Sequence, residues 1–376
     1  MNSEQFHPPV RVLAAVVLTI AAVYFHFLIF TQYALLHLIQ AAAGNGTQPP
    51  RMAILAAGAA GVAGSLFAAW RYTVARGPAQ LAGALALCAI AAGGSLLGKN
   101  PRWLPGVAAL SGLGAGVATV TLAAMLRRAA GRERLGLVIG LGTGLAYGAA
   151  NLPPVFAAEA PFQAVLAMLA ACVGLVTGRL FELRGPGEKP VVTDYAPGGA
   201  ALWILILLGL VGLDSMAFYV IQHTPALKEN TWTGAPRLFA NAGVHFLAAV
   251  LAGAALDRRW VGRTTLLAAG LLITACLLID GGSGWAPIGG LMYAAAVSLY
   301  STVLVFYPAR GARPWLAALI FAVAGWGGSA LGLGLAQGRG QVPGWLLAAT
   351  GILVGGALWV RRRRLESKAQ SSQPPF

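Results

Sequence analysis

The sequence has few charged residues, and acidic residues are the scarcer kind. Only 10% of its 376 residues are charged, with 11 Asp and Glu against 26 Lys and Arg. A water-soluble domain usually has about a quarter of its residues charged, so this composition excludes a soluble protein. The net charge of +15 would suit a nucleic-acid partner, but the basic residues stand at the ends of apolar stretches. We therefore expect no nucleic-acid binding.

Cysteine is scarce as well. The three cysteines are Cys88, Cys172 and Cys276, each inside an apolar stretch and at unrelated spacing. They indicate neither a disulfide framework nor a zinc site. No His-rich metal motif and no nucleophile–base spacing is visible. We therefore expect no metal, no cofactor and no enzymatic activity.

Long apolar runs are abundant instead, and twelve of them are about 20 residues long, enough for an α-helix to cross the roughly 30 Å hydrocarbon core of a bilayer. A helix also satisfies its own backbone hydrogen bonds in lipid. The predicted fold is an all-α polytopic membrane protein of twelve transmembrane helices, with the lipid bilayer as its partner. The predicted spans are 11–42, 52–72, 79–98, 105–126, 135–157, 162–182, 200–222, 237–256, 264–280, 286–307, 314–336 and 343–360.

The basic residues between these spans are distributed unevenly. All but six of the 26 Lys and Arg fall on the side that holds both termini. By the positive-inside rule, that side is the cytoplasm. We expect an integral, multi-pass protein of a bacterial inner (plasma) membrane, with both termini cytoplasmic. The six on the other side are Arg51, Lys99, Arg102, Lys228, Arg237 and Arg339.

The longest connection separates the sixth span from the seventh. Residues 184–199 are rich in Pro, Gly and charge. We predict an N-terminal six-helix bundle over 1–183, a cytoplasmic linker at 184–199, a C-terminal six-helix bundle over 200–360 and a basic cytoplasmic tail at 361–376. Two equal halves with the same orientation are the parallel-repeat plan of one large group of transporters.

Two motifs resemble those of the major facilitator superfamily, the twelve-helix secondary transporters. The loop after span eight reads Gly253-Ala-Ala-Leu-Asp257-Arg258-Arg259-Trp-Val-Gly262-Arg263, which is similar to the family's Gly/Asp/Arg/Gly/Arg signature. In span four, Ser111-Gly112-Leu-Gly114-Ala-Gly116 looks like its glycine-rich segment. The resemblance implies alternating access and a central cavity lined by spans one, four, seven and ten. It also implies a cytoplasmic gate made by Asp257, Arg258, Arg259, Gly262 and Arg263.

Other segments depart from the family pattern. The loop after span two, from Trp70 to Gly77, has no Asp. Span four has Val107, Ala108 and Ala109 where proton-coupled members often carry an Arg. Span five lacks the Gly-Pro pair of the family's antiporters. These departures disfavour drug–proton antiport of the usual kind.

Glycines recur every four residues on two predicted helices. Gly140, Gly144 and Gly148 share one face of span five, and Gly328 and Gly332 share one face of span eleven. Without a Cβ, two membrane helices can approach closely. Such faces fit either fixed packing or a sliding surface between two moving halves.

Asp214 is the one acid well inside a predicted span. A charged group at bilayer depth costs about 2.5–3.5 kcal/mol or more, so it usually faces a cavity and serves function. A carboxylic acid removed from water also favours its protonated form. Asp214 is thus a candidate proton carrier, and the alternative is a structural partner for a neighbouring Ser, Asn or His.

Polar and aromatic residues also form a line in span one. His26, Phe30, Tyr33, His37 and Gln40 fall within about 40° of one line at 100° per residue. Such a stripe should face protein or water, so His26, Tyr33 and His37 are candidate pathway residues. The alternative is that the two histidines are hydrogen-bonded structurally to neighbouring helices.

Three further candidates come from other spans. Tyr300 is too deep for the interfacial belt of tyrosines that suits Tyr307 and fits Tyr293. His245 stands one turn after Asn241, and Asn151 precedes Pro153-Pro154. The predicted substrate and proton pathway comprises Asp214, His26, Tyr33, His37, Asn151, His245 and Tyr300.

A cavity with one acid, several imidazoles and no Lys or Arg suits a small neutral or cationic solute. We therefore predict a secondary transporter that works by alternating access, with coupling to protons as an option. The alternative is a non-transporting receptor or an accessory subunit that retains the transporter fold.

Overall fold

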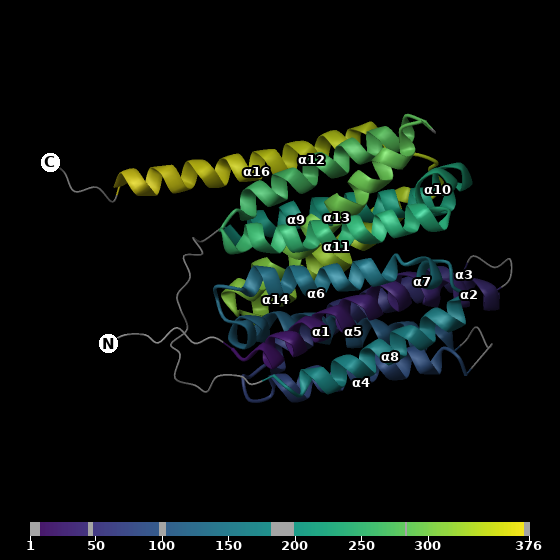
Figure 1. Ribbon diagram of the computed structural model, residues 1–376, viewed down its shortest axis with the longest axis horizontal. Coiled ribbons are helices and arrows are strands. Elements are labelled where there is room, and N and C mark those ends of the chain that lie inside the picture. The colour runs from purple at the N-terminus through teal and green to yellow at the C-terminus, as the bar shows by residue number, and fades with distance from the viewer. Residues whose placement is uncertain (1–7, 44–47, 98–102, 182–198, 283, 372–376) are drawn as a thin grey trace.

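The computed structural model describes residues 8–43, 48–97, 103–181, 199–282 and 284–371, and these are almost entirely helical (Figure 1). In the first half the elements are α1 (Val10–His26), η1 (Phe27–Ala34), α2 (Leu35–Ala43), α3 (Gln48–Arg71), α4 (Gly77–Gly94), α5 (Leu104–Ala130), α6 (Leu135–Ala150), α7 (Pro153–Phe156) and α8 (Ala160–Gly178). In the second half they are α9 (Gly199–His223), α10 (Pro225–Trp232), α11 (Ala235–Asp257), α12 (Val261–Asp280), α13 (Ala286–Gly311), α14 (Pro314–Leu319), η2 (Ile320–Gly327), α15 (Gly328–Ala336) and α16 (Gly344–Ser371).

Twelve helical runs match the twelve predicted spans. Within the described residues, eleven runs are long and apolar enough to cross a membrane. The twelfth, α6, has 16 residues and ends at Ala150, where span five was predicted to continue to 157. The break has a local cause, because the residue before a proline avoids the helical conformation. Leu152, which precedes Pro153, is extended, and α7 then starts a new short turn.

The helices run alternately in opposite directions. α1 begins and α16 ends at the same end of the molecule, on the left in Figure 1, which we term the terminal end. The opposite end, where α10 lies, we term the far end. α16 continues as a helix to Ser371, into the predicted tail. Residues 184–198 of the predicted linker lie outside the described residues.

The two halves of the chain form two groups of helices, which we term the first and the second bundle (Figure 1). Most helices pack mainly within their own half, whereas α6, α11 and α14 pack mainly on the other half. Across the interface, α6 packs on α11, α3 on α14 and η2, and α5 on α13. A cavity between the bundles would therefore be lined by both halves of the chain.

The glycine face of α6 lies in this interface. A Cβ on Gly140 would stand 3.1 Å from the Cα of Gly253 and 3.2 Å from the carbonyl carbon of Ala249, both on α11. Gly144 faces the same helix, where Ala249 and Phe246 lie within 3.2 Å of such a Cβ. The predicted close approach therefore joins the two bundles.

The first span contains a π-helical segment that the sequence pattern does not indicate. In η1 the N–H of Leu35 bonds to the carbonyl of Phe30, five residues earlier. A π-helix has more residues per turn than an α-helix, so side chains on either side of η1 lose the α-helical phase. The predicted polar stripe is divided as a result. His26 and Phe30 are buried in the first bundle, whereas His37 is exposed.

Candidate substrate and coupling site

Asp214 lies in the middle of α9, and its carboxylate is held by two tyrosines of α13. The Tyr293 hydroxyl donates to one carboxylate oxygen and the Tyr300 hydroxyl to the other. The two tyrosines are seven residues apart, which is two helical turns, so both point from one face of α13. Among the described residues, no Lys, Arg or His side chain hydrogen-bonds to this carboxylate.

The surroundings of Asp214 differ along the length of α9. Toward the terminal end, Leu207 and Val211 are 0% and 5% exposed. Asp214 itself is partly exposed, and so are Phe218 and Gln222, which follow at helical spacing toward the far end. On this face of α9 the side chains are therefore buried toward the terminal end and partly exposed from Asp214 toward the far end.

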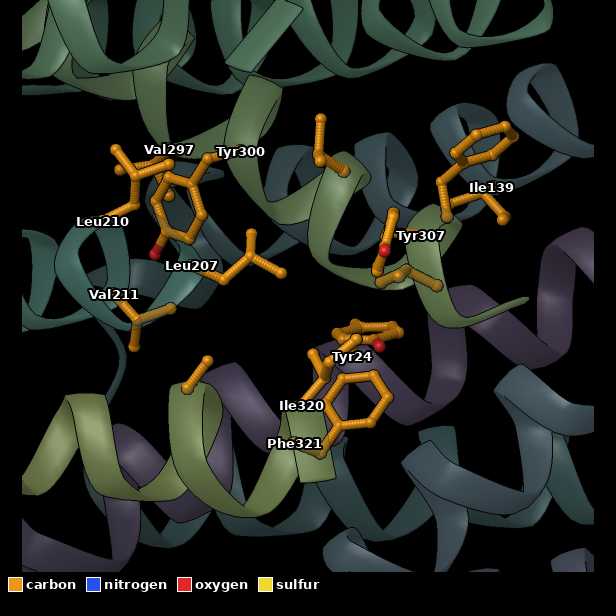
Figure 2. Close-up of a cluster of buried hydrophobic side chains, with 14 of the residues drawn as sticks. Tyr24, Ile139, Leu207, Leu210, Val211, Val297, Tyr300, Tyr307, Ile320 and Phe321 are labelled. Carbon is orange, nitrogen blue, oxygen red and sulfur yellow. The ribbon is translucent and has the colours of Figure 1, made fainter. Parts of the chain in front are cut away.

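The closed side is an apolar plug built by both bundles. Figure 2 shows Ile320 of the second bundle beside Tyr24 of the first, and Leu207, Val211 and Tyr300 of the second bundle as a separate group on the left. These side chains belong to one buried cluster. An aqueous path between Asp214 and the terminal end is excluded while they remain packed.

A second polar cluster joins the bundles beside this site. The Tyr147 hydroxyl on α6 lies 2.9 Å from the Ser301 hydroxyl on α13. The Tyr147 ring stacks on the His245 ring at a centroid distance of 5.1 Å. Nδ1 of His245 is 2.8 Å from the Ser298 hydroxyl. Tyr147 also interacts electrostatically with Asp214, so the first bundle reaches the coupling site through this residue.

A cluster of aromatic rings lies on the far-end side of Asp214. Trp232, at the end of α10, lies 5.4 Å from the Phe218 ring, 5.7 Å from the Tyr293 ring and 6.3 Å from the Phe156 ring. Phe156 in turn lies 5.7 Å from Tyr33. We refer to these five residues as the far-end aromatic cluster. Tyr33 and Phe156 belong to the first bundle and the other three to the second.

The terminal end is closed by bonds between the bundles. The carboxylate of Asp257, at the end of α11, accepts the backbone N–H groups of Gly136 at 2.6 Å and Leu137 at 2.9 Å, at the start of α6. A carboxylate at a helix N-terminus satisfies free N–H groups and complements the helix dipole. The Arg127 guanidinium also donates to the carbonyl of Arg310 at 2.9 Å.

The five residues of the signature loop make different kinds of contact. The hydrogen-bond partners of Asp257 are backbone N–H groups of the other bundle. The guanidinium groups of Arg258 and Arg263 lie over the Trp260 ring, at 6.0 and 5.4 Å. Arg259 has a left-handed backbone with φ 64°. Gly262 packs against Leu358 of α16.

Comparison with solved structures identifies the architecture. A crystal structure of FucP, a major facilitator superfamily transporter in the outward conformation, matches with a TM-score of 0.68, 11% identity and coverage of 94% of this chain and 99% of that one. The human organic anion transporter MFSD10 (TETRAN) matches with a TM-score of 0.62, 14% identity and the same coverage. The chain has the major facilitator superfamily fold. No protein-family model matches the sequence, and no curated protein matches it.

Within the superfamily fold, some predicted pathway residues come together. Asp214 and Tyr300 are in direct contact. His245 contacts Tyr147 and Ser298, which neighbour this pair. Tyr33 belongs to the far-end aromatic cluster and lies 4.5 Å from the exposed His37 ring.

Two predicted residues make other contacts. His26 is buried between α1 and α8, with Nδ1 3.3 Å from the Ala167 carbonyl of its own bundle. This contact fits the structural alternative for His26. Asn151 donates to the carbonyl of Tyr147 at 2.9 Å, where α6 ends. In the described residues, no group of three or more His, Cys, Asp or Glu could hold a metal ion.

Several residues of the site were not selected from the sequence. Tyr293 was placed in the interfacial belt, although its spacing from Tyr300 already put both on one face. Tyr147 stands in a glycine-rich segment that we interpreted only as a helix-packing face. Trp232 lies on α10, which we did not predict because Pro225–Trp232 is short and polar. For Trp232, no signal in the sequence pointed to the site.

Proposed function

We propose that the protein is a secondary transporter that moves a small neutral or cationic solute by alternating access, with Asp214 coupling transport to protons. The observation that carries this proposal is the carboxylate of Asp214, which two tyrosines hold inside a membrane-spanning helix, at the point where the buried side chains of α9 give way to partly exposed ones. A carboxylate at this depth is costly unless it serves a function. The fold it shares with solved transporters supports the same reading.

The proposed cycle follows from the contacts between the bundles. With the terminal end in the cytoplasm, as the charge distribution predicts, the structure is a state closed to the cytoplasm. To open inward, the bundles must break the bonds of Asp257 to α6 and of Arg127 to Arg310, and must separate the apolar plug. The aromatic rings of Phe156 and Trp232 already meet across the bundles at the far end, so they are placed to close that end.

Protonation of Asp214 would change contacts in both bundles. A neutral carboxylic acid is a weaker acceptor than a carboxylate, so protonation weakens the bonds from Tyr293 and Tyr300. Both tyrosines belong to α13, which also carries Ser301, the partner of Tyr147 in the first bundle. The proton thereby influences the contact between the two halves.

The proposal is tested by reconstituting the purified protein in liposomes that contain a pH-sensitive dye. A panel of sugars, amino acids and amines is added outside, and the internal pH is followed. We expect at least one solute to move protons with the wild type and with Asp280→Asn, a control acid at the end of α12, but not with Asp214→Asn. Solute flux with no proton movement would refute the coupling.

The alternative is a receptor or accessory subunit. It is favoured by the loop after α3, which lacks the acid of the family signature. Absence of flux for every solute, with retained ligand binding, would support this alternative.

A further inference from the structure

The carboxylate of Asp214 has no cationic partner. Its hydrogen-bond partners within the described residues are the hydroxyls of Tyr293 and Tyr300, which are neutral donors. A carboxylate inside a membrane protein normally pairs with a positive charge or binds a proton. Two phenol donors leave further acceptor positions on the two oxygens. A cation that reaches Asp214 can therefore complete this site.

The side chains on the far-end side of the carboxylate are aromatic. Trp232 and Phe218 lie directly beyond Tyr293, and Phe156 and Tyr33 face them from the other bundle. Aromatic rings attract an organic cation through their negative faces, and Trp attracts it best. An anionic solute would meet both the ring faces and the carboxylate unfavourably.

The other ionisable groups around the site do not supply the missing charge. Tyr147 of α6 and Cys276 of α12 interact electrostatically with Asp214, and both are neutral in their ordinary form. His245 contacts Tyr147 and Ser298. Lys228 of α10 is partly buried at the far-end rim, where it interacts with His37.

We propose that Asp214 and the far-end aromatic cluster form a binding site for a monovalent organic cation, such as a small primary or quaternary ammonium compound. This inference rests on the proposed function, because it names the solute class of the same site. The cation would insert between Asp214 and the far-end aromatic cluster, with its charge at the carboxylate and its alkyl groups against the rings.

A cation and a proton then compete for one carboxylate. When the cation binds, the O–H bond of protonated Asp214 breaks and the proton leaves to bulk water. Cation binding at acidic pH should thus release up to one proton and weaken about tenfold per pH unit below the titration of Asp214. Such a site would exchange cation for proton, although span five lacks the family's antiporter motif.

The experiment measures binding to the purified full chain in nanodiscs, by tryptophan fluorescence and thermal stabilisation. Two isosteric pairs serve as probes: choline with neutral dimethylbutanol, and phenethylammonium with neutral phenylethanol. We expect at least one cation to bind at least about tenfold more tightly than its neutral partner. Asp214→Asn should remove this preference, and Glu159→Gln, an exposed far-end acid, should keep it.

Trp232→Leu provides a second variant that leaves the acid in place. It should weaken cation binding about threefold to thirtyfold and leave proton release intact. Equal affinity for each cation and its neutral partner, or a cation preference that survives Asp214→Asn, would overturn the inference. Because binding needs no flux, cation binding without transport would refute the proposed function alone. Transport of a neutral solute without cation preference would refute this inference alone.

Discussion

The carboxylate of Asp257 accepts the backbone N–H of Gly136 at 2.6 Å across the interface between the two bundles. It also accepts the N–H of Leu137 at 2.9 Å, so one side chain of α11 caps the first turn of α6. The bond can exist only while the terminal end is closed. The cap of α6 is therefore present only when the two bundles are in contact at the terminal end.

Replacing Asp257 should therefore open the terminal end. Asp257→Asn keeps one acceptor oxygen but loses the charge and the second bond, which we estimate to be worth about 1–2 kcal/mol. The closed state should lose stability by roughly fivefold to thirtyfold. A single cysteine introduced for Leu207, in the apolar plug, should react faster with a water-soluble reagent. Asp280→Asn serves as the control, and an unchanged rate would remove Asp257 from the gate.

The close approach of α6 and α11 predicts a stability difference between two glycines. A methyl group on Gly140 would meet Gly253 at 3.1 Å, whereas one on Gly83 of α4 would meet nothing within 4 Å. Overpacking of this kind costs about 1–3 kcal/mol. Gly140→Ala should lower the thermal unfolding temperature in detergent, and Gly83→Ala should not. Equal temperatures for the two variants would contradict the observed packing.

The tyrosines that hold Asp214 should set the pH at which it titrates. A donor to a carboxylate stabilises its charged form, and a hydrogen bond to a charged group contributes about 1.5–3 kcal/mol. Removing the donor in Tyr300→Phe should move the midpoint of proton-linked activity about one to two pH units higher. Tyr307→Phe, whose ring packs on Trp203, is the matched control. A midpoint identical to that of the wild type would show that Tyr300 does not act on the carboxylate.

The orientation in the membrane is a separate prediction from the charge distribution. Cysteines introduced at Gly187 and Ser367 should react only from the cytoplasm, and a cysteine at Thr47 only from outside. Gly187 and Thr47 lie outside the described residues, but labelling needs only their side of the membrane. Labelling of position 187 in intact cells by a reagent that cannot cross the membrane would reverse the orientation.

The spans were predictable because their length and polarity are local properties of the sequence. The end of span five was predicted too late, at 157, although Pro153 restricts Leu152 and marks the break. The π-helical turn of η1 was not predictable, because neither proline nor a charge marks it in the sequence. Its effect was to separate His26 from His37, which an α-helical phase had aligned.

The coupling site was predictable in part. Asp214 stood out as the one acid inside a span, and the line of tyrosines in α13 gave Tyr300. The bonds of Asp257 to α6 depend on how the two bundles dock. A loop motif carries no information about this docking, so it could not distinguish α6 from the neighbouring arginines as the partner of Asp257. The contacts of Trp232 and Tyr147 depend on the same docking.

The most direct test of the account is whether Asp214 is needed for proton-driven accumulation but not for exchange. A pH gradient of one unit supplies about 1.4 kcal/mol for each proton that moves, enough for roughly tenfold accumulation. Asp214→Asn keeps the size of the side chain and cannot titrate. In liposomes loaded with a saturating concentration of a transported solute, which offsets the weaker binding, we predict that it still exchanges internal for external solute but no longer accumulates solute in response to a pH gradient. If the Asn variant accumulates solute with the pH dependence of the wild type, Asp214 is structural and the account is wrong.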